Sequence, residues 1–246
     1  MKPPPIASFD FPETALKRSR SKWWERAADL VISVPAIILL GPVFLLVAAY
    51  VKLVSNGPIL FKQKRIGHNG LPFMILKFRT MHVNACTAEH ENHTANLIKG
   101  NAPMTKLDAQ GDSRLIPFGK FIRAAGLDEL PQLFNVLRND MSVVGPRPCL
   151  LTEFAEYSTR EKQRFNTLPG LTGLWQVSGK NDLTFEEMIN CDLDYVERKN
   201  LWLYALIILK TPFVLVKQVA DTRRTGKLTQ MPSAPLPRFE KEAVGQ

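Results

Sequence analysis

The longest apolar segment of the chain runs from Leu30 to Val51 and contains 22 residues without a charge. As a helix it would be roughly 33 Å long, enough to cross the hydrocarbon core of a bilayer. Pro35, Gly41 and Pro42 interrupt the segment. A proline near the middle of a helix removes a backbone donor and favours a kink. The pattern therefore predicts a membrane helix that is broken at Gly41-Pro42.

Cations flank this segment on both sides, so the usual excess of positive charge at one end of a membrane helix is missing. Because such flanks remain in the cytoplasm, we expect both ends on that side and interpret the segment as a re-entrant helix. A kinked transmembrane anchor and a buried helix of a soluble core are the two alternatives. The flanking cations are Lys17, Arg18, Arg20, Lys22 and Arg26 before the segment, and Lys52, Lys62, Lys64 and Arg65 after it.

Short elements follow the apolar segment. Residues 59–81 predict two short strands joined by a turn that contains His68, Asn69 and Gly70. Residues 84–113 are polar and are expected to form a loop. From Leu115 to Asp140 the pattern becomes helical, and one apolar stripe has helical spacing. The stripe consists of Leu130, Leu133, Phe134 and Leu137.

The second half of the chain predicts further helices. Residues 149–166 indicate one helix, and 168–182 indicate a structured loop rich in glycine. The next helix begins near Thr184, which with Glu187 matches a capping box. The last apolar stretch, 201–219, contains Lys210 and Pro212, which we expect to break it. We interpret it as an interfacial or partly docked helix and not as a second span.

These patterns divide the chain into four parts. Residues 1–16 are rich in proline and predict a flexible tail, and 17–54 form a basic interfacial stretch with the membrane helix. Residues 55–222 are predicted to form one catalytic domain. Residues 223–246 are expected to be a basic, disordered tail.

Composition adds a partner class to this picture. The 246 residues are 45% hydrophobic, which is sufficient for one core of ordinary size. A net charge of +9 indicates a polyanionic partner: nucleic acid, an acidic membrane surface or a phosphorylated substrate. Cys86, Cys149 and Cys191 are widely spaced, so neither a zinc site nor a disulfide framework is indicated, and a reducing cytoplasmic setting is favoured.

Two adjacent carboxylates, Asp128 and Glu129, stand at the head of the helical pattern in "LDELPQLFNVLRNDMSVVGPRP". Their position at a helix N-terminus could be explained by capping alone. The same helix end would also keep a carboxylate ionised at a place where phosphates collect. Capping and catalysis are therefore both open at this point.

Several cations lie in short motifs around this pair. Arginine offers a planar pair of donors that suits phosphate oxygens. Each cation alone would suit a solvated surface, but together with two carboxylates in a membrane-associated chain they indicate a phosphate-handling site. No P-loop or dinucleotide-binding motif is present. The cations are Lys77, Arg79, Arg114, Arg123 and Arg147.

Three long motifs in this order resemble the bacterial sugar transferase family, the monotopic polyprenyl-phosphate phosphoglycosyl transferases that start exopolysaccharide, capsule and O-antigen repeat units. They are "FKQKRIGHNGLPFMILKFRTM", "LDELPQLFNVLRNDMSVVGPRP" and "PGLTGLWQVSGKND". The likeness runs from about Arg26 to Thr211. It is closest to the exopolysaccharide-priming galactose and glucose phosphotransferases that use undecaprenyl phosphate.

The resemblance implies a helix-rich α/β monotopic membrane protein. A re-entrant helix would precede a compact cytosolic domain with short strands and interfacial amphipathic helices, at the cytoplasmic face of the bacterial inner membrane. The implied reaction transfers a sugar 1-phosphate from a UDP-sugar, galactose or glucose, to undecaprenyl phosphate and releases UMP. Anionic lipids are expected partners, nucleic acid is not, and a homodimer is left open.

Site residues follow from the resemblance position by position. Asp128 would be the nucleophile that forms a covalent phosphosugar intermediate, and Glu129 would help hold Mg²⁺. Gly41-Pro42 would break the membrane helix. The remaining predicted contacts to phosphate or donor are Arg123 and Arg147, supported by Lys77, Arg79 and Arg114, and, in the later loop, Gln176 and Lys180.

The chain departs from the usual family pattern at several positions. Gly126 and Gly41 stand where serine is usual, Ser178-Gly179-Lys180 replaces Asn-Gly-Arg, and Asn200 and Tyr204 replace a frequent serine and aspartate. Two other functions are alternatives: a basic nucleic-acid-binding module, which salt-dependent DNA binding would reveal, and a noncatalytic scaffold of a polysaccharide export complex. The intact Asp128-Glu129 pair argues against the scaffold.

Overall fold

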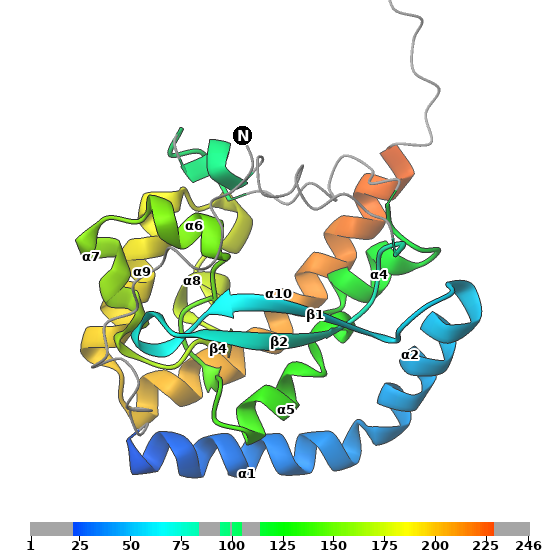
Figure 1. Cartoon of the computed structure of the whole chain (residues 1–246), viewed down its shortest axis with the longest axis horizontal. Helices are drawn as coiled ribbons and strands as arrows, with labels where there is room; N and C mark the ends of the chain where they lie inside the picture. Colours follow the sequence, from blue (N-terminus) through cyan, green and yellow to red (C-terminus); the bar gives the residue numbers. More distant parts are fainter. Residues whose placement is uncertain (1–21, 84–93, 99, 105–113, 229–246) are drawn as a thin grey trace, which may run out of the picture.

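The computed structural model describes residues 22–83, 94–98, 100–104 and 114–228. Two helices, α1 (Trp23–Leu39) and α2 (Gly41–Val54), form a bent pair along one side of the molecule (Figure 1). They meet at Leu40 at an angle of 61°. Pro42 lies in the first turn of α2, where the missing N–H has no intrahelical partner to lose. The predicted break at Gly41-Pro42 is confirmed.

The predicted hairpin is also present. Strands β1 (Leu60–Ile66) and β2 (Pro72–Phe78) pair in antiparallel register, from Leu60 opposite Phe78 to Ile66 opposite Pro72. The turn η3 (His68–Gly70) places Asn69 and Gly70 in left-handed conformations with φ of 54° and 75°. Asparagine and glycine are the residues that adopt this conformation most readily.

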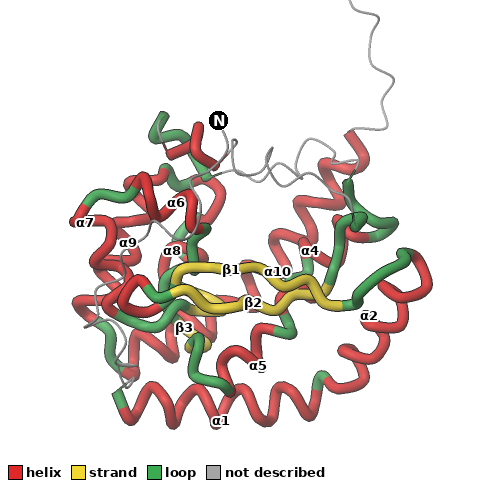
Figure 2. The backbone as a smooth tube through the Cα atoms, viewed as in Figure 1, coloured by secondary structure: helices red, strands yellow, loops and turns green. Residues whose placement is uncertain are grey.

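A second, parallel pair joins β3 (Ser142–Val144) to β4 (Gly170–Thr172). Both sheets are small, and helices surround them (Figure 2). The helix-rich α/β class with short strands is therefore as predicted.

The helical region from Leu115 to Asp140 is divided into α4 (Gly119–Ala124), the 3-10 turn η5 (Leu127–Glu129) and α5 (Gln132–Leu137). The predicted apolar stripe is only partly right, because Phe134 is 39% exposed while Asn135 is fully buried. Asn135 Nδ2 donates to the Met74 carbonyl at 2.7 Å, and its Oδ1 accepts from Leu76 N–H at 3.0 Å. Helix α5 thus packs on the free edge of β2 through a polar side chain, which hydrophobic spacing does not reveal.

The segment predicted as one helix over 149–166 is instead three short elements: α6 (Leu151–Glu156), α7 (Thr159–Lys162) and η6 (Gln163–Asn166). Ser158 interrupts the helix because it caps α7, with its N–H donating to Glu161 Oε2 at 2.6 Å. The glycine-rich loop after it contains β4, α8 (Leu174–Val177) and η7 (Lys180–Asp182).

Two long helices complete the chain. Helix α9 (Phe185–Arg198) begins with the predicted capping box, in which Thr184 N–H donates to Glu187 Oε2 at 2.8 Å. Helix α10 (Leu201–Leu228) is continuous, so the prediction that Lys210 and Pro212 break it is wrong. A proline inside a helix removes one backbone hydrogen bond, which a helix of this length tolerates. The helix also includes the first residues of the segment predicted as a tail from Arg223.

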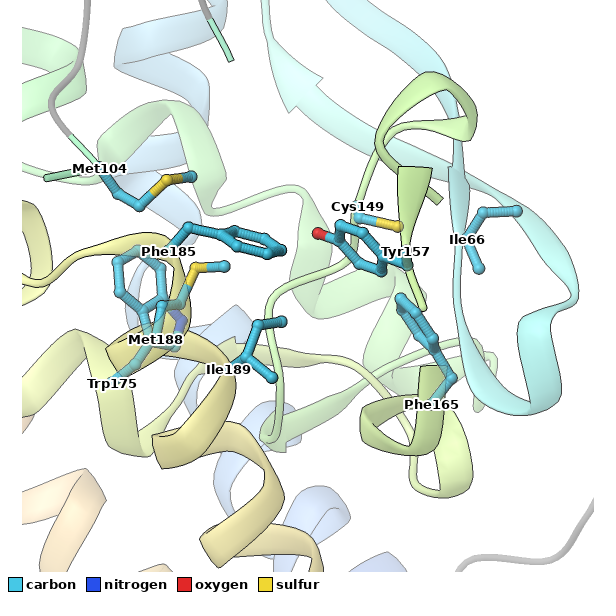
Figure 3. Packing of buried hydrophobic residues seen from close by; sticks show 9 residues of the cluster. All are labelled: Ile66, Met104, Cys149, Tyr157, Phe165, Trp175, Phe185, Met188 and Ile189. Carbon is cyan, nitrogen blue, oxygen red and sulfur yellow. The ribbon is translucent and has the colours of Figure 1, made fainter. Parts of the chain in front are cut away.

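Three clusters of buried side chains hold these elements together. One lies between β1 and helices α8 and α9 (Figure 3) and includes Ile66, Cys149, Tyr157, Phe165, Trp175 and Met188. A second joins the hairpin, α5, β3, α9 and α10 through Ile75, Val136, Val143, Tyr195 and Ile207, and Trp24 and Ile32 of α1 pack against it. The third packs α2 against Phe78 and Ile116.

Large apolar side chains are exposed on α1, α2 and α10. The most exposed include Val31, Ile38 and Leu39 on α1, Leu45, Leu46 and Leu53 on α2, and Leu209, Phe213 and Val216 on α10, all between 68% and 85% exposed. By length and composition, the Leu201–Asp221 part of α10 could cross a membrane, and so could the bent α1–α2 pair. We name these exposed residues of the three helices the apolar face.

Candidate active site

Asp128 and Glu129 lie in the 3-10 turn η5 between α4 and α5. Asp128 is only 6% exposed. Gly126 precedes the turn, and its φ of 70° lies in the left-handed region that favours glycine. Pro131 occupies the N-cap position of α5, no side chain caps this helix, and neither carboxylate stands at that position. The capping interpretation of this pair is therefore wrong for α5.

The structure brings Lys77 of β2 to this turn. Its Nζ lies 2.7 Å from Glu129 Oε1, and both side chains are partly exposed. The two residues are 52 positions apart in the chain, so only tertiary structure could establish the pair. Lys77 therefore supplies a positive charge directly beside the two carboxylates.

Arg65 was predicted only as a cation that flanks the apolar segment, and not as a site residue. It is 7% exposed on β1, and its Nε donates to Gln63 Oε1 at 3.1 Å. Its Nη1 has no hydrogen-bond partner among the described residues. Burial lowers the pKa of Arg65. The negative charges of Glu153 and Glu129 oppose this shift, and the positive charge of Arg147 adds to it. Arg65 therefore lies within electrostatic reach of both Glu129 and Arg147.

Arg147 follows β3 in the loop Gly145-Pro146-Arg147-Pro148, which backbone contacts hold tightly. Gly145 N–H donates to the Thr172 carbonyl at 2.9 Å, and Gly170 N–H donates to the Pro146 carbonyl at 2.8 Å. A Cβ on Gly170 would collide with the backbone of Gly145. Glycine at these positions thus allows the Arg147 loop and the glycine-rich loop to lie backbone against backbone.

A buried ion pair also stabilises the loop that carries Arg147. Arg164 contacts Asp192 of α9, and each side chain is 1% exposed. Arg164 Nη2 also donates to the Arg147 carbonyl at 3.0 Å, and its Nη1 donates to Tyr157 Oη at 3.3 Å. Burial raises the pKa of Asp192 to about 6, against the opposing effect of Arg164. Arg164 therefore fixes the backbone that carries Arg147.

The other predicted arginines have different surroundings. Arg79 is buried, and its Nη atoms donate to the Asn56 and Ser55 carbonyls, both at 2.8 Å, so it closes the turn after α2. Arg123 lies in the last turn of α4, which contacts η5. Arg114 lies beside the bridge between Met81 and Leu115, and its carbonyl accepts from His82 N–H at 2.9 Å.

Gln176 and Lys180 lie in the glycine-rich loop. Gln176 Oε1 is buried without a hydrogen-bond partner among the described residues, next to Gly173. Lys180 has a left-handed φ of 46°, and its Nζ donates to Gln218 Oε1 of α10 at 3.1 Å. This contact links the loop to the helix that carries part of the apolar face.

The described residues contain no group of three or more His, Cys, Asp or Glu side chains arranged to hold a metal ion. Mg²⁺ needs no such cage, because it is often bound by one or two carboxylates together with substrate phosphates. The partly exposed carboxylate of Glu129 fits that mode. Cys149 is not a rival nucleophile, since burial raises the pKa of its thiol.

Comparison with known proteins shows the family of the chain. The model of the family described as "Bacterial sugar transferase" matches residues 20–218. The chain belongs to this family. As a bacterial sugar transferase, it is 40% identical over 187 residues to the exopolysaccharide production protein ExoY of Sinorhizobium fredii, covering 76% of this chain and 83% of that protein.

Two further relatives of this sugar transferase have names that state a reaction. A UDP-glucose:undecaprenyl-phosphate glucose-1-phosphate transferase of Caulobacter vibrioides is 40% identical, covering 76% of this chain and 67% of that protein. An undecaprenyl-phosphate galactose phosphotransferase of Salmonella typhimurium is 34% identical, covering 82% of this chain. The chain covers only 42% of the Salmonella protein.

Proposed function

We propose that this sugar transferase moves a sugar 1-phosphate from UDP-galactose or UDP-glucose to undecaprenyl phosphate and releases UMP. The observation that carries the proposal is the buried Asp128 beside the Glu129–Lys77 ion pair, in a domain from which an apolar face extends. The names of the relatives support both sugars and the lipid acceptor.

The first step is attack of an Asp128 carboxylate oxygen on the phosphorus that carries the sugar. A P–O bond forms to Asp128, the P–O bond to the nucleotide breaks, and UMP leaves with that electron pair. In the second step an oxygen of the ionised lipid phosphate attacks the same phosphorus, and Asp128 is released as a carboxylate. Two half-reactions with a covalent intermediate give ping-pong kinetics.

The chain's own cations would neutralise the negative charge of the diphosphate in the first step. A carboxylate approaching a diphosphate meets like charge, so the phosphate oxygens must be neutralised. Lys77 lies beside Glu129, and Arg65 lies within electrostatic reach of Glu129 and Arg147. Glu129 would help hold Mg²⁺, which when bound supplies additional positive charge to the diphosphate.

The apolar face supports a location at the inner membrane, with the catalytic domain on the cytoplasmic side. The bent pair α1–α2 would enter one leaflet and return, which its 61° angle permits. Helix α10 would lie along the interface, and the net charge of +9 would favour anionic lipids. In this arrangement the head group of a lipid phosphate would lie within reach of the site.

Asp128→Asn tests the proposed chemistry. We expect it to lower UMP release by about 10³-fold or more, as for the loss of a covalent nucleophile. Purified protein in detergent would be incubated with undecaprenyl phosphate, Mg²⁺ and UDP-galactose, UDP-glucose or their N-acetylated analogues. With labelled donor and no acceptor, wild-type protein should retain labelled sugar phosphate, and Asp128→Asn should not.

The matched control is Asp194→Asn, which changes a carboxylate on α9 that is 40% exposed. It should turn over at the wild-type rate. Near-normal turnover by Asp128→Asn would reject Asp128 as the nucleophile. No UMP release by wild-type protein from any of the donors would reject the proposed reaction itself.

A further inference from the structure

The most deeply buried residues of helix α1 are polar, and large apolar residues of the same helix are exposed. Glu25, Asp29 and Ser33 are buried at 5%, 0% and 0% exposure. They are spaced four apart and so lie on one face of the helix. Val31 and Ile38, on other faces, are more than 70% exposed. The helix therefore contacts the catalytic domain through these polar groups as well as through the apolar Trp24 and Ile32.

Asp29 is the centre of this contact. One oxygen, Oδ1, accepts three hydrogen bonds: from Val143 N–H at 2.7 Å, from Ser142 Oγ at 2.8 Å and from Tyr204 Oη of α10 at 2.7 Å. A buried charged acceptor makes strong hydrogen bonds and is costly to remove. Asp29 thus joins the N-terminal helix, β3 and the C-terminal helix at one atom.

Two neighbouring residues strengthen the same contact. Arg26 donates to the carbonyls of Val136 and Leu137 at 2.6 and 2.7 Å, at the C-terminal end of α5. Glu25 pairs with Lys199, which precedes α10, at 2.7 Å. Helix α1 is therefore bound to both elements that extend from the site: α5, which follows Asp128, and β3, which precedes Arg147.

Hydrogen bonds constrain the backbone between the residues that contact Asp29 and Arg147. Asp29 holds Ser142 and Val143, and the chain from there to Arg147 is hydrogen-bonded at nearly every step. Ser142 N–H donates to the Pro169 carbonyl at 2.8 Å, and Gly145 N–H donates to the Thr172 carbonyl. The Pro146 carbonyl accepts from Gly170 N–H, and the Arg147 carbonyl accepts from Arg164 Nη2. A displacement of β3 would therefore move the Arg147 backbone.

We propose that Asp29 is a positioning residue for sugar-phosphate transfer, which holds the Arg147 loop in place relative to Asp128 and to the helices of the apolar face. The inference rests on the proposed function. It assigns to α1 a task beyond anchoring: the helix sets the geometry of the phosphate-binding loop. Glu25, Arg26 and Tyr204 share this task through the contacts described.

A double-mutant cycle between Asp29 and Arg147 tests the inference. Asp29→Ala should lower kcat for transfer about 10- to 100-fold, because a binding group misplaced by about 1 Å can cost 10²-fold in rate. In an Arg147→Ala background the same change should cost less than about 3-fold, since coupled residues are not additive. A radiolabelled donor makes the low rates measurable.

The matched control is Ser33→Ala, which lies on the same buried face and whose hydroxyl has no hydrogen-bond partner among the described residues. It should leave kcat unchanged in both backgrounds. If Asp29→Ala does not fold, Ser142→Ala replaces it in the cycle. That variant removes one of the three hydrogen bonds and should show a smaller loss with the same dependence on Arg147.

An equal loss in both backgrounds would overturn the inference, because a purely structural residue acts independently of Arg147. A folded Asp29→Ala with wild-type kcat would overturn it as well. Both outcomes require an active wild-type protein. They therefore differ from failure of the proposed function, in which wild-type protein transfers no sugar phosphate.

Discussion

At the scale of single residues, Asp128 and Glu129 are adjacent but have different surroundings. Asp128 is 6% exposed, whereas the Glu129 side chain is 34% exposed and pairs with Lys77. A buried carboxylate is held in a fixed position and is shielded from water, which suits a nucleophile. A more accessible carboxylate beside a cation suits a ligand that exchanges with solvent and metal. The proposed division of roles follows this difference.

The role of Glu129 is tested with Glu129→Gln. We expect the Mg²⁺ concentration for half-maximal transfer to rise about 10-fold or more, because an amide is a weaker ligand for this hard cation. The measurement is a Mg²⁺ titration of UMP release. Glu156→Gln, an exposed change on α6, is the control and should leave the titration unchanged. An unaltered titration for Glu129→Gln would remove Glu129 from the metal site.

At the scale of elements, buried polar contacts hold short helices that have little stability of their own. Helices of four to six residues, such as α5, α6 and α7, are too short to be stable alone. Asn135 attaches α5 to β2, and the Arg164–Asp192 pair attaches η6 to α9. Such contacts specify which face of a short helix packs inward, because an unpaired buried charge is costly.

Arg164→Met tests this support. Loss of Arg164 leaves Asp192 buried without its partner, and we expect unfolding free energy to fall by about 3–5 kcal/mol. Denaturant unfolding in detergent measures it. Arg198→Met, which removes a pair to Asp194 with side chains 74% and 40% exposed, is the control and should cost about 1 kcal/mol or less. Similar costs for both variants would contradict the proposed support.

Elements with local signals were predictable, and those that depend on distant contacts were not. The hairpin was identified from alternating residues and the turn at Asn69-Gly70, and α9 from the capping box of Thr184. The apolar stripe of α5 did not predict its buried face correctly, because the polar Asn135 is buried where it hydrogen-bonds to β2. Helix α10 was expected to break at Pro212, but it continues through that residue, because a helix of this length tolerates the loss of one backbone hydrogen bond.

At the scale of the whole molecule, the apolar face lies on helices from both ends of the described chain. Helices α1 and α2 are N-terminal and α10 is C-terminal, and Asp29 joins the first and last of them through Tyr204. Exposed apolar patches of this kind mark contact with a membrane or a partner. The buried polar residues of α1 contact the domain, and its exposed apolar residues would face lipid in the proposed arrangement.

Labelling of single cysteines tests the re-entrant arrangement. Lys22→Cys and Asn56→Cys, in a chain whose own cysteines are replaced, mark the two ends of the α1–α2 pair. If the pair returns to its starting side, a membrane-impermeant maleimide should label neither site in intact cells and both sites after permeabilisation. Labelling of one site in intact cells would establish a span instead.

The sequence alone determined the features that depend on neighbouring residues. These include the broken apolar segment, the hairpin, the capping box and the family, which motifs of contiguous residues carry. It also predicted Asp128, Glu129, Lys77 and Arg147 as site residues through those motifs. Only tertiary structure brought Lys77 to Glu129, revealed Arg65 and Arg164, and turned Asp29 toward β3. The physical reason is that burial and hydrogen-bond partners of a charged residue depend on distant elements, which no local pattern encodes.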